Sequence, residues 1–338
     1  MRRIVTKSLL LCLLLSKAYC QDIHQSQFYT SPLNLNPALC GNFYGDSRIF
    51  LNYRNQYFVD DLVNYLTFTG SFDMRFYPKR WTSKGLWSGG LLLNYDQAGI
   101  SKLGLTNVGV ASSYSYPLKT SQVITIGGLI GGSSRRFDVE KLTWDEQWNG
   151  YQGDPTRPNG ENLNTTSNFF LDLSAGLNYR WQKSQRTKFD AGIGAYHLNK
   201  PDQIFYSGNQ KSKLPIRASL SLIPSIKLTN KIDLLGHALY QNQGKYTETV
   251  LGGYGKFYLN AKRGQELSIL LGIASRLHDA LIPKIALEYK NFYFGASYDI
   301  NSSPFKVATN RRGGPEFSFS YTFVKARVLE QLRACPIY

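Results

Sequence analysis

Apolar and polar residues alternate with a period of two along most of the chain. From Phe169 to Trp181 the odd-numbered side chains are apolar, whereas Asp172, Ser174, Asn178 and Arg180 lie between them. Successive side chains of a strand point to opposite sides of the sheet, so this pattern predicts a strand with one apolar and one polar face. The same alternation recurs in the segments 65–77 and 314–323.

The alternation predicts about fourteen strands, most of them ten residues or longer. Strands of globular proteins are usually about five or six residues long, whereas about 9–11 residues are needed to cross a bilayer at a tilt. The predicted strands therefore have the length of membrane-crossing strands. They are 47–57, 65–77, 85–96, 104–117, 121–133, 168–181, 187–199, 215–229, 231–242, 247–260, 265–277, 281–290, 291–300 and 314–323.

The connections between these strands are unequal in a regular way. Every second connection is short, with the exception of 78–84, and the others include long loops at 134–167, 200–214 and 301–313. Short turns on one side and long loops on the other are typical of outer-membrane barrels, and closure leaves no unpaired strand edge in lipid. Aromatic residues also recur near the strand ends, where the girdles of such barrels lie.

We therefore expect an all-β fold, namely a transmembrane antiparallel up-and-down β-barrel of about fourteen strands with short periplasmic turns and longer extracellular loops. The alternative is a soluble β-sandwich, because its strands also alternate and its polar face meets water. No stretch after residue 20 has the ~18 consecutive apolar residues of a membrane-spanning helix.

The first twenty residues have the features of a secretory signal peptide: basic residues, a short apolar core, and Ala18-Tyr19-Cys20 before the cleavage site. We expect the mature chain to begin at Gln21, and the alternative is a lipoprotein signal with Cys20 lipidated. The expected parts of the chain are the signal peptide 1–20, a periplasmic N-terminal segment 21–46, the barrel 47–323 with its long extracellular loop 134–167, and a periplasmic C-terminal tail 324–338.

The chain is strongly basic, with 39 Lys and Arg against 23 Asp and Glu and a net charge of +16. Four of the basic residues lie in the signal peptide, which leaves +12 for the rest. An exported chain does not meet nucleic acid, and the basic residues are scattered singly and not clustered on one face. We therefore expect no nucleic-acid partner and interpret the charge as a solvated surface or lumen.

Two cysteines remain after cleavage, Cys40 before the first predicted strand and Cys335 after the last. The first and last strands of a closed barrel are neighbours, so a Cys40–Cys335 disulfide is one interpretation and two unlinked thiols are the other. The four histidines are isolated from one another in sequence, and no Ser/His/Asp constellation, P-loop or HExxH motif occurs. We expect no enzyme, no metal site and no cofactor.

The first part of the mature chain, QDIHQSQFYTSPLNLNPALCGNFYGDSRIFLNYRNQY, resembles the start of the PorP/SprF family of type IX secretion system membrane proteins of Gram-negative bacteria. Two later stretches, LTWDEQWNGYQGD and GIGAYHLNKPDQIF, are also similar to the family, whereas Cys40 stands where a small residue is expected. The N-terminal residues that carry the resemblance are Gln21, Asp22, His24, Ser26, Gln27, Phe28, Tyr29, Ser31, Pro32, Asn36, Pro37, Ala38, Gly41, Arg48, Asn52, Tyr53, Arg54 and Gln56.

This resemblance implies an outer-membrane component of the type IX secretion system. Such proteins aid the export or surface attachment of cargo, including gliding adhesins, or link the barrel layer to the periplasmic ring. The implied partners are secretion components, secreted cargo and the lipid bilayer, and no small-molecule substrate is indicated. A diffusion porin or solute uptake channel, and a soluble secreted β-sandwich binding protein, are the alternatives.

Two segments are candidate contact sites. The N-terminal segment is either a structural plug or a docking surface for periplasmic partners, and the long loop is either a lid over the barrel mouth or a contact for cargo. The candidate residues are His24, Gln27, Phe28, Tyr29, Asn36 and Pro37 in the first segment and Trp144, Gln147, Trp148 and Tyr151 in the second. The carboxylates of the loop lack the spacing of a calcium site.

Charged residues on the polar strand faces are the last group of interest. We interpret them as ion pairs that fill the lumen of the barrel, and the alternative is a pathway for solutes. They are Arg48, Arg54, Asp73, Arg75, Asp172, Arg180, Glu288 and Lys290.

Overall fold

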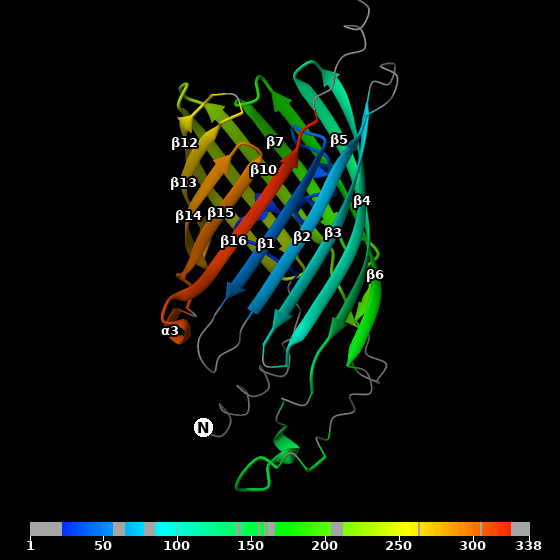
Figure 1. Ribbon diagram of the computed structural model, residues 1–338. Helices are drawn as coiled ribbons and strands as arrows, with labels where there is room; N and C mark the ends of the chain where they lie inside the picture. Colours follow the sequence, from blue (N-terminus) through cyan, green and yellow to red (C-terminus); the bar gives the residue numbers. More distant parts are fainter. Residues whose placement is uncertain are drawn as a thin grey trace, which may run out of the picture.

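The chain folds into a closed antiparallel barrel of fourteen strands in the computed structural model (Figure 1). Each strand pairs with its neighbours along the chain, β7 pairs with β10, and the first strand pairs with the last. A separate two-stranded sheet is formed by β8 and β9. The structure describes residues 22–56, 65–77, 85–99, 101–139, 142, 144–154, 156–158, 160, 166–203, 212–262, 264–304 and 306–325.

The barrel strands match the predicted segments to within three residues at either end, which confirms the expected fold. Only the pair β8 (Asp202–Gln203) and β9 (Ser212–Lys213) lies in a predicted loop. The barrel strands are β1 (Ser47–Gln56), β2 (Tyr65–Phe76), β3 (Leu86–Ala98), β4 (Leu103–Lys119), β5 (Gln122–Arg136), β6 (Ser167–Gln182), β7 (Lys188–Tyr196), β10 (Arg217–Lys227), β11 (Ile232–Gln243), β12 (Tyr246–Asn260), β13 (Leu267–Arg276), β14 (Ala280–Tyr289), β15 (Phe292–Asn301) and β16 (Arg312–Phe323). The short helices are η1 (Phe28–Thr30), α2 (Pro32–Leu35), η2 (Pro37–Leu39), η3 (Asp145–Gln147) and α3 (Lys306–Thr309).

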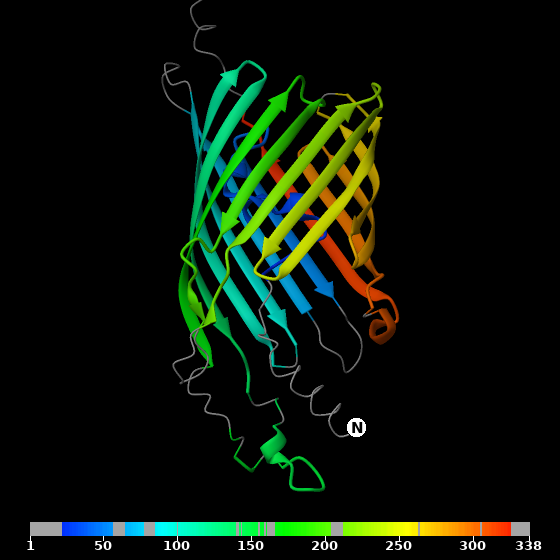
Figure 2. The same ribbon diagram turned by 180° about the vertical axis from the view of Figure 1, so that it is seen from behind.

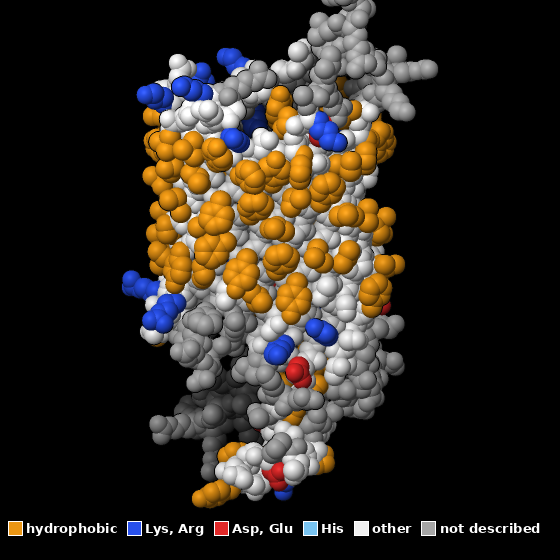
Figure 3. Space-filling model, viewed as in Figure 1, with side chains coloured by type: hydrophobic (Ala, Val, Ile, Leu, Met, Phe, Trp, Pro, Cys, Tyr) orange, Lys and Arg blue, Asp and Glu red, His pale blue; other side chains and the backbone are white. Residues whose placement is uncertain are grey.

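The apolar faces of the strands point outward. Ile126 and Ile130 on β5 are each 63% exposed, whereas the inward-facing Thr125 is buried. Figure 3 shows the outward apolar side chains as a belt around the visible face of the barrel. This arrangement is the reverse of a soluble β-sandwich, which buries its apolar faces, and it fits a wall surrounded by lipid. Among the described residues, no helix is long and apolar enough to cross a membrane.

The two ends of the barrel differ. At one end, here called the short-turn end, the strands are joined by turns such as 120–121 and 290–291, and the start of β1 pairs with the end of β16 through Ser47 and Phe323. At the other end, the long-loop end, the connection 137–166 extends beyond the barrel (Figure 1). The short turns of outer-membrane barrels face the periplasm, which fixes the orientation.

The segment before β1 lies inside the barrel (Figures 1 and 2). We call residues 22–46 the plug. Asp46 at its end donates its backbone N–H to the carbonyl of Phe323 at the short-turn end, at 2.8 Å, whereas Asp22 lies beside Arg217 and His197 toward the long-loop end. The expectation of a segment on the periplasmic side is therefore corrected: the plug runs through the lumen, because buried polar groups of the wall satisfy its irregular backbone.

Candidate functional site

The middle of the plug rests on glycines of the barrel wall. Pro37 begins η2, and the Asn36 side chain accepts a hydrogen bond from the Ala38 N–H at 2.9 Å, which caps that turn. A Cβ atom placed on the inward-facing Gly127 of β5 would lie 2.5 Å from backbone atoms of Pro37 and Ala38. On β6, a Cβ atom at Gly176 would lie 1.9 Å from Asn36 Oδ1. The wall approaches the plug this closely only because these positions carry no side chain.

The start of the plug is held by two buried carboxylates. Glu316 accepts hydrogen bonds from the backbone N–H groups of Ser26 and Gln27, at 2.7 and 2.8 Å. Asp299 accepts a hydrogen bond from the Ser26 hydroxyl at 2.7 Å and forms an ion pair with Arg54 at 2.7 Å. Arg54 in turn donates to the carbonyl of His24 at 2.6 Å, so wall charges satisfy the plug backbone directly.

The side chain of Gln27 is fully buried and bonds to three neighbouring groups of the wall. Its amide donates to Ser297 Oγ and to the Glu316 carbonyl, both at 3.1 Å. Its Oε1 accepts a hydrogen bond from Ser318 Oγ at 2.8 Å. Gly295 leaves room for this amide, since a Cβ atom there would lie 2.7 Å from Oε1. The amide nitrogen and the amide oxygen of Gln27 therefore both have hydrogen-bond partners on the wall, as buried polar side chains of a protein core do.

The aromatic residues of the plug pack against the wall between β11 and β14. Phe28 meets both Tyr29 and His237 of β11 edge to face, and the Tyr29 ring is tilted by 45° to the ring of His237. The Tyr29 hydroxyl is 2.5 Å from the hydroxyl of Tyr254, and the Lys284 ammonium lies 5.0 Å from the centre of the Tyr29 ring. Lys284 also donates to the carbonyl of Ser26 at 3.0 Å, so this cluster joins the aromatic and the charged contacts of the plug.

The first described residue of the plug, Asp22, is enclosed by charges. Its carboxylate lies 3.0 Å from His197 Nε2 and 3.1 Å from Arg217 Nη1. Although burial alone would raise the pKa of Asp22, Arg217 and His197 lower it below its usual range. Burial alone would lower the pKa of His197, but Asp22 and Asp172, which is 3.0 Å from Nδ1, raise it to about 9. Both groups are therefore charged at neutral pH.

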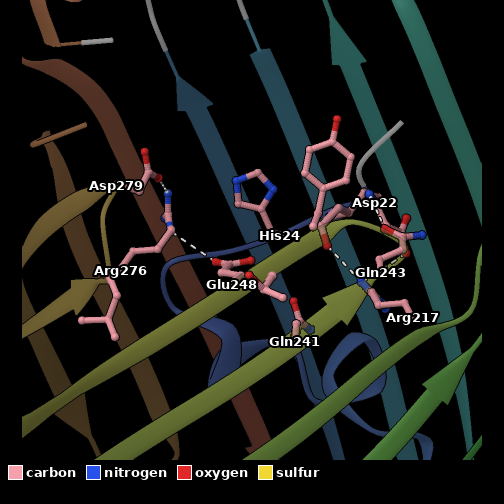
Figure 4. A pocket seen from close by; sticks show the side chains of 12 residues that line it. Asp22, His24, Arg217, Gln241, Gln243, Glu248, Arg276 and Asp279 are labelled. Carbon is pink, nitrogen blue, oxygen red and sulfur yellow. Dashed lines mark hydrogen bonds and ion pairs between the residues drawn. The ribbon is translucent and has the colours of Figure 1, made fainter. Parts of the chain in front are cut away.

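A polar pocket of about 180 Å³ opens beside Asp22 near the long-loop end (Figure 4). Asp22 and His24 of the plug form one side of it, and Arg276 on the wall forms ion pairs with Glu248 and Asp279, at 3.2 and 2.7 Å. Burial and the positive charges of Arg54 and Arg276 hold the pKa of His24 well below its usual range, so its ring is neutral. The pocket mixes both charges and has no metal-ligating cluster among the described residues.

The end of the plug is fixed at the short-turn end. The N–H of Gly41 donates to Asp73 at 2.8 Å, and Arg75 donates to the Gly41 carbonyl at 2.7 Å. The Cys40 side chain is fully buried against Leu33, and burial together with Asp73 raises the pKa of its thiol to about 12. Cys335 lies outside the described residues, so the predicted disulfide stays a prediction that non-reducing peptide mapping can test.

The candidate residues of the long loop are arranged differently. Trp144 precedes the turn η3 and Gln147 ends it, and the Gln147 side chain accepts a hydrogen bond from the Trp144 N–H at 3.2 Å. Trp148 is 57% and Tyr151 91% exposed. The loop extends away from the barrel and does not fold over its mouth (Figure 1), so the expectation of a lid is not met. Two of its aromatic side chains are therefore free to contact another molecule.

The structure brings the candidate residues of the plug together but separates them from those of the loop. His24, Gln27, Phe28, Tyr29, Asn36 and Pro37 all contact or line the lumen wall, as their contacts above show. The interpretation of charged strand faces as lumen ion pairs also describes Arg48 with Asp73 and Arg180 with Asp190. Lys290, by contrast, is exposed in a turn.

Sequence analysis missed several wall residues that hold the plug. Glu316, Asp299 and Lys284 lie more than 250 positions from the plug residue Ser26 that they bind, and no local pattern marks them. The available signal was a charged residue on a strand face without a charged partner nearby in sequence. The glycines Gly127 and Gly176 were visible in the sequence, but their contact with the plug was not.

Comparisons with known proteins agree with this architecture. The family described as "Type IX secretion system membrane protein PorP/SprF" matches residues 17–321, and no curated protein matches the sequence. A Pseudomonas aeruginosa FadL homologue is similar in structure, with a TM-score of 0.50 and 11% identity over 85% of this chain and 93% of that one. The CymD monoaromatic hydrocarbon channel has a TM-score of 0.50 and 9% identity over 88% and 94%. At such low identity these two structures show the barrel fold alone.

Proposed function

The chain belongs to the PorP/SprF family of type IX secretion system membrane proteins, and we propose that it is a non-enzymatic docking component of that system in the outer membrane. In this proposal it aids the export or surface attachment of secreted cargo, such as adhesins, or links the barrel layer to the periplasmic ring. The family and the outer-membrane barrel support the general role, and the particular cargo and partners are the proposed part.

The observation that carries the proposal is the plug. A diffusion porin needs an open lumen, but here residues 22–46 fill it and are held by buried hydrogen bonds to wall groups such as Glu316 and Asp299. Breaking a buried charged hydrogen bond costs about 1.5–3 kcal/mol, and the plug makes several of them. The filled lumen therefore favours a scaffold whose two ends contact partners over a channel for solutes.

The exposed aromatic residues support contact with cargo at the long-loop end. Trp148 and Tyr151 are large, exposed side chains on a loop that extends from the outer end of the barrel. Tyrosine and tryptophan are enriched at protein interfaces because they bury a large area at a small cost in conformational entropy. We assign the loop residues Trp144, Gln147, Trp148 and Tyr151 to cargo contact and the plug residues to closing and shaping the barrel.

Deletion of the gene tests the proposal. Surface and secreted proteins of the deletion strain, compared with a strain carrying the intact gene, should lack at least one type IX cargo, while uptake of small solutes is unchanged. A strain with a complete set of type IX cargo but impaired solute uptake would refute the docking role and favour a channel. Replacement of Trp148 and Tyr151 by Ala then tests whether the loop takes part.

A further inference from the structure

The connections between strands carry very different charge at the two ends of the barrel. The six connections at the short-turn end contain nine Lys or Arg residues and a single acidic residue, Glu266. The seven connections at the long-loop end contain nine Lys or Arg residues against ten Asp or Glu. The basic residues of the short-turn end are Lys79, Arg80, Lys84, Lys183, Arg186, Lys231, Lys262, Arg263 and Lys290.

Seven lysines of the short-turn end are exposed among the residues that the structure describes. We use the name lysine rim for the exposed lysines that the structure describes at this end. They lie at the ends of strands as well as in turns. No acidic side chain at this end is exposed among the described residues, and Asp46 and Glu266 are partly buried. The rim consists of Lys119, Lys183, Lys227, Lys231, Lys262, Lys290 and Lys325.

Several partly buried charges near this end are, in contrast, paired. Arg186 forms an ion pair with Asp233 at 2.6 Å, and Lys256 forms one with Glu288. Asp233 and Glu288 are therefore paired with other cations, and among the described residues no printed ion pair joins either of them to a rim lysine. Seven like charges around one end repel one another, and a partner with the opposite charge would relieve this repulsion. Such complementarity raises the rate of association and selects the partner.

We propose that the lysine rim is a docking surface for an acidic face of a periplasmic protein of the secretion machinery. This inference rests on the proposed function, which places the short-turn end against periplasmic components. The rim favours a protein over lipid headgroups because its lysines lie mostly in turns, and Figure 3 shows Lys and Arg side chains beyond the apolar belt at this end. Lysines that serve only as lipid anchors lie at the edge of the belt.

A matched pair of charge-reversal variants tests this surface. In the rim variant Lys119, Lys183, Lys231 and Lys262 are replaced by Glu. In the control variant the exposed residues Lys102, Lys200, Lys213 and Arg311 of the long-loop end are replaced by Glu, which changes the net charge equally. The full chains are extracted from native membranes in mild detergent, and the secretion components that co-purify are identified and quantified by mass spectrometry. Heat-modifiable gel mobility confirms that both variants fold.

A second experiment tests the attraction between the rim and acidic groups without the cellular partner. Binding of poly-L-glutamate is measured to each protein in nanodiscs of phosphatidylcholine, at about 50 and about 500 mM salt. In the rim variant we expect the co-purified amount of periplasmic components and the affinity for poly-L-glutamate each to fall by at least about tenfold. In the control variant both quantities should stay within about twofold of wild type. Wild-type binding should also weaken at the higher salt concentration.

The results separate this inference from the proposed function. A rim variant that retains the periplasmic components as wild type does would overturn the docking surface and leave the proposed function intact. A rim variant that retains them but loses a preference for phosphatidylglycerol over phosphatidylcholine nanodiscs would reassign the rim to lipid headgroups. A wild-type chain that co-purifies with no secretion component would overturn both.

Discussion

Substitution of Gly127 by Ala should loosen the plug without unfolding the barrel. The added Cβ atom would lie 2.5 Å from backbone atoms of Pro37 and Ala38, far inside normal contact. Backbone atoms cannot rotate away as a side chain can, so η2 must move off the wall. Gly128, the next residue, is the matched control, because a Cβ atom there meets only the Ser174 carbonyl at 3.8 Å.

The magnitude follows from overpacking. An extra methyl group in a well-packed core costs about 1–3 kcal/mol, which corresponds to an increase of about 5- to 140-fold in the population with the plug displaced. The wall itself keeps its hydrogen bonds, so most of this cost falls on the contact between the plug and the wall. The Gly128→Ala variant should differ from wild type by less than about 0.5 kcal/mol.

Alkylation of Cys40 reports the displacement. Its thiol is fully buried and its pKa is raised to about 12, mainly by burial, so it reacts only when η2 leaves the wall. In a Cys335→Ser background at pH 8, Gly127→Ala should raise the rate of Cys40 alkylation by about 5- to 140-fold. Equal rates in wild type and Gly127→Ala, or equal acceleration by Gly128→Ala, would refute the close contact between the plug and Gly127.

Three further predictions concern the plug and the loop. Glu316→Gln should weaken the plug start by about 1–3 kcal/mol and accelerate hydrogen exchange at Ser26 and Gln27, whereas Glu288→Gln, whose partner is Lys256, should not. His197 has a pKa raised from 6.5 to about 9, so its stabilisation is complete below pH 6.5 and is lost as pH rises through 9; the difference in unfolding temperature between wild type and His197→Gln should shrink over that range. A difference that grows with pH would contradict the ion pair with Asp22. Tyr151→Ala should leave the unfolding temperature unchanged, since the side chain is 91% exposed, and a clear loss of stability would show that the loop packs on the barrel.

The barrel was predictable from sequence because its signal is local. Alternation over ten or more residues identifies each strand, and the sequence of short and long connections gives its direction. The ends of β5 and β7 fit the prediction least well, since each differs from the predicted end by three residues. The pair β8 and β9 was missed because two residues are too few to show a period.

The course of the plug was not predictable for the same physical reason. Its three short helices have no periodic pattern, and its partners are brought together only when the barrel closes. Ser26 meets Glu316 across a sequence separation of 290 residues. The Pro and Asn residues indicated irregular turns, but nothing in the segment showed that Gly127 and Gly176 leave room for Pro37 and Asn36 inside the wall.

A disulfide between the plug and the wall tests the central claim most directly. The Cβ atom that Gly90→Cys adds to β3 would lie 3.1 Å from the Cys40 sulfur, within reach of a disulfide. In a Cys335→Ser background under mild oxidation, mass spectrometry of the membrane-embedded protein should find residues 40 and 90 linked in Gly90→Cys and unlinked in Gly89→Cys. Two free thiols in oxidised Gly90→Cys would place the segment outside the lumen and contradict the account.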